Sequence, residues 1–209
     1  MKKYYLFDFD GTLVDSMEFW AGIHIEALRN AGIPIPDKFV ETITPLGNYN
    51  AAKHTLSLGI DIPLETYLED VYEKLIKAYS THIALKPNVK STLEALKAKN
   101  ISINVLTASP HLYVDPCLSR TGIYQLFENV WTIDDFGLTK DKTEIYRQAA
   151  NRLNAEISNC TMIDDNLTAI STAKKSGMQT IAVYDSTSKA AEEMLKKTAD
   201  RYIYDFKEL

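Results

Sequence analysis

The stretch Tyr4-Tyr5-Leu6-Phe7-Asp8-Phe9-Asp10-Gly11-Thr12-Leu13 joins an apolar run to two carboxylates, a glycine and a threonine. A short aromatic and aliphatic run that ends at a turn signal predicts a buried strand of a parallel sheet. Ligands bind at the carboxyl ends of such strands, so we expect the chemistry of the protein at Asp8 and Asp10. Because these residues are two positions apart, a pleated strand would project both side chains to the same side.

Two carboxylates this close repel each other unless a cation lies between them or one takes a proton. A hard divalent metal resolves the repulsion. Gly11 allows a tight turn after the strand and leaves room for a close anionic group, and the amides that follow can act as donors.

The composition is that of an ordinary globular protein, with 209 residues, 45% hydrophobic and 24% charged. This length suits one α/β core with a smaller insert. A net charge of −5 argues against nucleic acid or an acidic membrane surface as a partner. Cys117 and Cys160 match no metal-ligand spacing, and no stretch matches a signal peptide or a membrane span. We therefore expect a cytoplasmic protein, a monomer or weak dimer.

A helix is predicted to follow the first loop, with Asp15 or Ser16 as its cap and Gly32 at its end. From Asp37 to about Thr81 no strand-like alternation occurs, and apolar residues recur at helical spacing. This block predicts an all-helical insert.

Beyond the insert, strand patterns alternate with helix patterns. The expected strands are residues 101–106, 129–133, 160–163, 180–184 and a short edge strand at 202–204. The expected helices are one opened by Lys86-Pro87-Asn88, then 115–121, 143–153, 167–176, and a last one capped by Ser186 or Thr187. Such alternation predicts right-handed crossovers and a doubly wound parallel sheet in an α/β fold, interrupted by the helical insert after its first strand.

The motif Asp8-Phe9-Asp10-Gly11-Thr12-Leu13-Val14-Asp15-Ser16 resembles the first signature of the haloacid dehalogenase-like hydrolases, in the branch of phosphoglycolate phosphatase and β-phosphoglucomutase. The resemblance implies a Rossmann-like core at residues 1–15 and 84–209, and a helical cap at 16–83. It also implies a Mg²⁺-dependent phosphatase with Asp8 as nucleophile and Asp10 as general acid and base, acting on a small phosphorylated metabolite through an aspartyl-phosphate.

Two further segments resemble the next signatures of the family. The segment Val105 to Pro110 implies that the Thr107 hydroxyl and the Ala108 amide, together with Gly11, hold the phosphoryl group. A lysine should offset its charge. The family spacing favours Lys140, but the usual prolines after it are absent, which leaves Lys142 as an alternative.

Asp164 and Asp165 form a second acidic pair at the end of a strand. Carboxylates that converge on one edge of a sheet make an oxygen site suited to Mg²⁺. Counting back from Gly177, the family pattern implies that Asp165 is a direct ligand, with Asp8 and Asp10, and that Asp164 acts through water or a neighbouring ligand.

In capped relatives the insert contacts the leaving group. The stretch Gly47 to His54 is therefore the candidate substrate contact, with Asn50 and Lys53 as its binding residues. Two alternatives to hydrolysis are a phosphosugar mutase, which carries a histidine where Trp20 stands and usually Val or Ile where Thr12 stands, and a catalytically silent protein that binds a phosphorylated ligand. A phospho-accepting receiver module fits poorly, because its acidic pair lies on the first strand.

Overall fold

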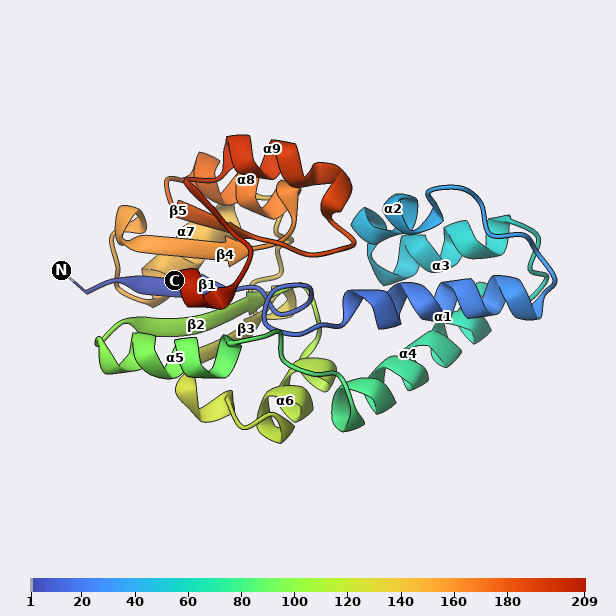
Figure 1. The fold of residues 1–209 in the computed structure, drawn as a ribbon, viewed down its shortest axis with the longest axis horizontal. Helices are drawn as coiled ribbons and strands as arrows, with labels where there is room; N and C mark the ends of the chain where they lie inside the picture. Colours follow the sequence, from blue (N-terminus) through green and yellow to red (C-terminus); the bar gives the residue numbers. More distant parts are fainter. Residues whose placement is uncertain (1) are drawn as a thin grey trace.

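The computed structural model describes residues 2–209, which form a parallel sheet, its covering helices and a separate group of helices (Figure 1). The strands are β1 Tyr4–Phe7, β2 Ser102–Thr107, β3 Asn129–Thr132, β4 Cys160–Asp164, β5 Gln179–Val183 and β6 Arg201–Ile203. The helices are α1 Met17–Asn30, α2 Phe39–Ile43, α3 Gly47–Ser57, α4 Leu64–Thr81, α5 Val89–Ala98, α6 His111–Arg120, α7 Thr143–Arg152, α8 Leu167–Ser176 and α9 Glu192–Thr198.

The strands pair in parallel in the order β3-β2-β1-β4-β5-β6. The chain adds β2 and β3 on one side of β1 and then crosses over to add β4, β5 and β6 on the other side. The carboxyl end of β1 is therefore the switch point where open α/β sheets bind ligands. The expected α/β fold with a doubly wound parallel sheet is confirmed.

Alternate residues of the central strands are buried on opposite faces of the sheet. Phe7 and Ile163 belong to the core cluster that includes residues of α5 and α6, whereas Leu6 and Met162 pack with α7 and Ala173 of α8. A strand that is covered on both faces needs apolar residues on both. This explains why β1 is an uninterrupted apolar run rather than an alternation of apolar and polar residues.

Helices α1 to α4 follow β1 and lie together beyond the carboxyl ends of the strands, away from both chain termini (Figure 1). The segment from α1 to the end of α4 contains only helices, short helical turns and loops, as the sequence predicted. None of the helices in the described part of the chain has the length and apolarity needed to cross a bilayer.

The two predicted helix caps have different outcomes, because Ser16 stands at the start of α1 as expected, whereas the predicted cap of the last helix is wrong. Ser16 is the residue that precedes α1, but its hydroxyl donates to Asp10 and accepts no hydrogen bond from an amide of the first turn. The last helix begins at Glu192, because Asp185 accepts hydrogen bonds from both the amide and the hydroxyl of Thr187 and keeps that segment in a turn.

Candidate active site

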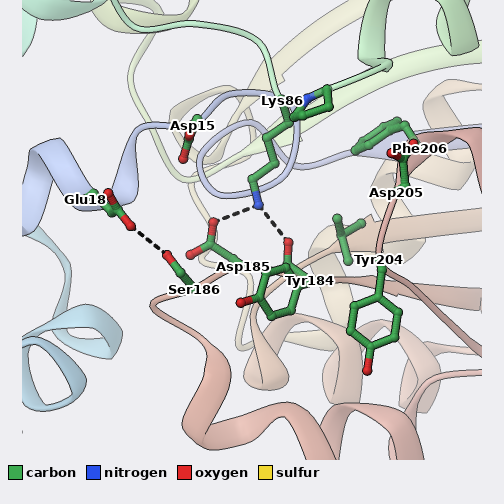
Figure 2. A pocket seen from close by; sticks show the side chains of 11 residues that line it. Asp15, Glu18, Lys86, Tyr184, Asp185, Ser186, Tyr204, Asp205 and Phe206 are labelled. Atoms are coloured by element: carbon green, nitrogen blue, oxygen red, sulfur yellow. Dashed lines mark hydrogen bonds and ion pairs between the residues drawn. The ribbon is translucent and has the colours of Figure 1, made fainter.

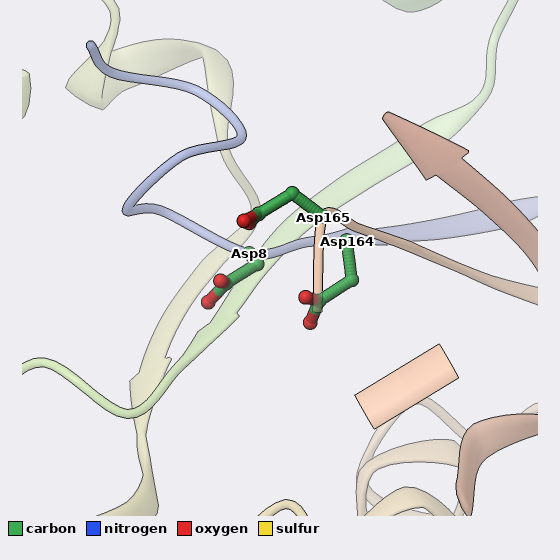
Figure 3. A group of neighbouring side chains, drawn as sticks. All are labelled: Asp8, Asp164 and Asp165. Carbon is green, nitrogen blue, oxygen red and sulfur yellow. The ribbon is translucent and has the colours of Figure 1, made fainter. Parts of the chain in front are cut away.

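Asp8 follows the last residue of β1, Asp164 ends the neighbouring strand β4, and Asp165 follows it. The amide of Asp8 donates to the carbonyl of Ile163 at 2.9 Å, which fixes the two strand ends beside each other. One oxygen of each of these three carboxylates lies within 4.8 Å of the others, and all three residues are buried (Figure 3). These three aspartates are called the acidic cluster below.

Lys140, in the loop before α7, is the cation of the acidic cluster. Its Nζ lies 2.8 Å from Oδ1 of Asp8 and 2.5 Å from Oδ2 of Asp164. The Tyr146 hydroxyl donates to the carbonyl of Lys140 at 2.9 Å and anchors the loop. Burial lowers the pKa of Lys140, but the Asp164 and Asp8 carboxylates outweigh this effect and raise it, so the ammonium stays charged.

The alternative lysine, Lys142, is exposed, and its Nζ pairs with Asp141 at 3.0 Å. The structure therefore brings Lys140, and not Lys142, to Asp8. The Lys140 ammonium thus contacts two of the three carboxylates of the acidic cluster.

The donor set of the acidic cluster fits a divalent metal. Each of the three residues offers a carboxylate oxygen, the ligand type that Mg²⁺ prefers, and these oxygens lie near enough to one another to contact one ion. Lys140 balances only one of the three negative charges. Burial, followed by the charges of Asp164, Asp8 and Asp185, raises the pKa of Asp165 well above its ordinary value, so the cluster without a further cation is electrostatically unfavourable.

Asp165 is held by hydroxyls from two directions. Thr12 donates to its Oδ1 at 3.2 Å and Ser188 to its Oδ2 at 2.9 Å. Gly11 has a φ of 69°, and a Cβ there would lie 2.7 Å from Oδ2 of Asp165. The close anionic group for which Gly11 leaves room is therefore the Asp165 carboxylate.

The Asp10 side chain does not join the acidic cluster. Three hydroxyls donate to it, from Ser16 at 2.6 Å, from Tyr79 of α4 and from Ser109 after β2. The strand ends at Phe7 and the chain bends at Phe9, so the alternation of a pleated strand no longer applies to Asp10. The Asp10 carboxylate therefore lies outside the acidic cluster, and the expected contact of Asp10 with the metal stays a prediction.

Asp10 is instead placed as an isolated acid beside the same cavity. Burial raises its pKa, and the three hydroxyl donors oppose that rise. Both Asp8 and Asp10 line a cavity of about 200 Å³ that also includes Ala108, Trp20 and Tyr79.

Thr107 ends β2 and is buried, and its Oγ1 accepts a hydrogen bond from the Ser109 amide at 3.0 Å. Ala108 adjoins Asp8 and Lys140 in a second, neighbouring cavity. The end of β2 therefore lies beside Asp8, as the sequence indicated, and the Thr107 hydroxyl also stabilises the turn that follows the strand.

The predicted substrate contacts Asn50 and Lys53 lie outside the residues that line the Asp8 cavity, and both are exposed. Asn50 donates to the carbonyl of Leu46. Gly47 and Asn48, at the start of α3, line the cavity instead. At 100° per residue, Asn50 lies about 200° and Lys53 about 140° around the helix from Asn48, so neither faces this cavity, and their contact with a substrate stays a prediction.

A buried ion pair supports the segment that carries Ser188. Nζ of Lys86 lies 2.7 Å from Oδ2 of Asp185 and donates to the carbonyl of Tyr184 at 2.8 Å (Figure 2). The Lys86 amide donates to the carbonyl of Leu13. The segment that returns from the helical insert is thereby connected to the first signature on one side and to the Ser188 segment on the other.

Four hydroxyls of the site escaped the sequence reasoning: Ser16, Tyr79, Ser109 and Ser188. Ser16 and Ser109 stand inside or beside the quoted signatures, so a search for donors near Asp10 could have found them. Tyr79 and Ser188 carry no local signal, because only the fold brings them to Asp10 and Asp165.

This fold and this site define a class of protein, the haloacid dehalogenase-like hydrolases. The family profile matches residues 5–183, and the chain belongs to this family. The prediction of an enzyme of this hydrolase family is confirmed.

Among particular proteins, the chain is 26% identical to validoxylamine A 7'-phosphate phosphatase from Streptomyces hygroscopicus subsp. limoneus, over 94% of each chain. It is 23% identical to the phosphorylated carbohydrates phosphatase of Thermotoga maritima, over 84% of this chain and 82% of that one. Its fold is similar to the crystal structure of β-phosphoglucomutase from Clostridium difficile, with a TM-score of 0.77 and 21% identity, over 100% of this chain and 93% of that one.

Proposed function

We propose that the protein is a Mg²⁺-dependent phosphatase that hydrolyses a small phosphate monoester through an aspartyl-phosphate on Asp8. The observation that carries the proposal is the position of Asp8, whose carboxylate lies 2.8 Å from Lys140 Nζ, belongs to the acidic cluster and faces the cavity lined by Asp10. The named phosphatases of similar sequence support it.

In the first step a carboxylate oxygen of Asp8 forms a bond to phosphorus, and the ester P–O bond breaks. Asp10 gives its proton to the departing alkoxide, for which its raised pKa is suited. Lys140 offsets the negative charge on the transferring group. In the second step Asp10 takes a proton from water, which attacks the phosphorus and releases phosphate and the Asp8 carboxylate.

Asp8, Asp164 and Asp165 would hold Mg²⁺ in this proposal. The bound ion would supply charge stabilisation of the phosphoryl oxygens. Thr12 and Ser188 orient Asp165, and Gly11 admits it. Thr107, Ala108 and Gly11 remain the proposed contacts of the phosphoryl group.

We further propose that residues 16–83 form a cap over a core made of residues 1–15 and 84–209. The cavity beside Asp8 is lined both by residues of helices α1, α3 and α4 and by residues at the sheet edge, which supports a closing role for these helices. A cytoplasmic location is proposed from the two free, buried cysteines.

A phosphosugar mutase is disfavoured by Trp20. Its Nε1 donates to Oδ1 of Asn48 at 2.5 Å, so a hydrogen-bonded indole, which cannot shuttle a proton at neutral pH, stands where the mutases carry a histidine. A silent binding protein is disfavoured by the joint presence of Asp8, Asp10 and Lys140.

The test is the hydrolysis of p-nitrophenyl phosphate and of alkyl phosphates by the Asp8→Asn variant. We expect turnover to vanish while the melting temperature in Mg²⁺ stays that of a folded protein. Asp15→Asn is the matched control, because Asp15 is exposed and lies outside the acidic cluster. Wild-type turnover by Asp8→Asn would overturn the proposed function.

A further inference from the structure

The cavity beside Asp8 is small. Its volume is about 200 Å³, below the range of about 300 to 1,000 Å³ that is usual for sites of drug-sized ligands. The phosphoryl group is expected at the Asp8 end, where a second cavity of about 220 Å³ lined by Lys140 adjoins this one, so this volume is left mainly to the leaving group, which is therefore a small molecule.

The charges that line this cavity are of one sign. Its carboxylates are Asp8, Asp10 and Asp165, and among the lining residues that the structure describes there is no lysine or arginine. Lys140 points to Asp8 and Asp164, where the phosphoryl group is expected, and is not a lining residue of the rest of the cavity. A second anionic group on the substrate would therefore find no cationic partner in the rest of the cavity.

The remaining wall is apolar and aromatic, with neutral polar groups. Trp20, Tyr79 and Tyr113 are buried, and the rings of the two tyrosines stack with centroids 5.3 Å apart. Thr44 and Asn48 supply neutral polar atoms from the helical insert. The Trp20 indole N–H donates to the side-chain oxygen of Asn48. The side-chain N–H groups of Asn48 can therefore donate to another acceptor, such as a substrate hydroxyl.

We infer that the leaving group is small, uncharged and hydroxylated, as in sugar and polyol monophosphates. Esters that carry a second anionic group, such as bisphosphates and phosphorylated carboxylic acids, are rejected. This inference rests on the proposed phosphatase function and specifies its substrate class.

The test compares sorbitol 6-phosphate with 6-phosphogluconate, which share the carbon chain and the phosphate but differ at the far end, a hydroxymethyl group against a carboxylate. We expect kcat/KM to favour sorbitol 6-phosphate by at least about tenfold, because a partly desolvated carboxylate without a cationic partner is disfavoured. The hydrolysis of p-nitrophenyl phosphate is measured in parallel, to report phosphatase chemistry independently of this preference.

A placed cation tests the cause of the preference. Thr44 is half-buried and lines the cavity, whereas Thr42 is exposed and outside it. Thr44→Lys should raise kcat/KM for 6-phosphogluconate relative to sorbitol 6-phosphate by about tenfold, whereas Thr42→Lys, with the same change in net charge, should leave the ratio unchanged.

Equal kcat/KM for the two esters, or a preference for the carboxylate, would overturn the inference while leaving the phosphatase function intact. So would equal shifts of the ratio in the two lysine variants. Loss of hydrolysis of all three esters by the wild-type protein would instead overturn the proposed function on which the inference rests.

Discussion

The Ser188 hydroxyl donates to Oδ2 of Asp165 at 2.9 Å and joins the segment after β5 to the acidic cluster. The Lys86 and Asp185 ion pair holds the start of that segment, with side chains 12% and 3% exposed. Asp165 is thus oriented from outside the strand that carries it. Groups that orient a metal ligand in this way commonly contribute to metal affinity.

Ser188→Ala should weaken Mg²⁺ binding by about 10- to 100-fold, because Asp165 loses the donor that fixes its second oxygen. The dissociation constant is measured by calorimetry or by the Mg²⁺ dependence of the melting temperature. Ser188→Thr, which keeps the hydroxyl, should bind nearly as the wild type. Ser186→Ala is the control, because Ser186 is exposed in the same segment and donates to Glu18. Equal weakening in both alanine variants would contradict this role of Ser188.

The two candidate lysines give a matched pair. Lys140→Ala should lower kcat/KM by about 10²- to 10³-fold, the usual loss when an electrostatic group of an active site is removed. In EDTA it should also destabilise the fold, by about 3 to 5 kcal/mol, because Asp8 and Asp164 lose their buried cation. Lys142→Ala should change neither quantity much. A larger loss of activity in Lys142→Ala would transfer the role to that residue.

Much of this arrangement could be predicted from local sequence. The continuous apolar run before Asp8 indicated a strand buried on both faces, and the alternation of patterns after residue 100 indicated the parallel sheet. The acids at the ends of β1 and β4 converge because neighbouring parallel strands end at one edge. This required only the topology, which the alternation of elements already implied.

What could not be predicted depends on where the chain departs from regular geometry. The direction of Asp10 depends on the bend at Phe9, which no periodicity describes. The contacts of Tyr79 and Ser188 join residues 69 and 23 positions apart from their partners, so no spacing rule reaches them. Asn50 and Lys53 were chosen for their polarity, but only the rotation of α3 decides which residues face the cavity.

Tyr79→Phe should impair proton transfer, because it removes one of the three donors that hold Asp10. A hydrogen bond to a charged group contributes about 1.5 to 3 kcal/mol, so turnover of alkyl phosphates should fall by about tenfold or more. Nitrophenyl phosphates should be affected much less, because their leaving group needs no proton. Tyr67→Phe is the control, since this buried tyrosine of the same helix contacts His24 instead. Equal losses on both classes of ester would contradict the assignment.

His24 makes the fold sensitive to acid. It is buried in α1, its Nδ1 lies 2.9 Å from the Tyr67 hydroxyl, and within the described residues its Nε2 has no partner. Burial lowers its pKa from 6.5 to about 4. The unfolded chain therefore binds a proton at a higher pH than the folded chain does, so the stability that neutral His24 preserves above pH 6.5 is lost as the pH falls from 6.5 to about 4.

The loss associated with His24 amounts to roughly 3 kcal/mol over that interval. The measurement is the free energy of unfolding in urea at several pH values between 7 and 4. His24→Gln, which does not titrate, should flatten the decline by that amount, whereas His82→Gln, at an exposed position, should leave it unchanged. If the wild type and His24→Gln lost stability in parallel, the acid sensitivity would have to come from other groups. The buried neutral state of His24 would then have no measurable share in it.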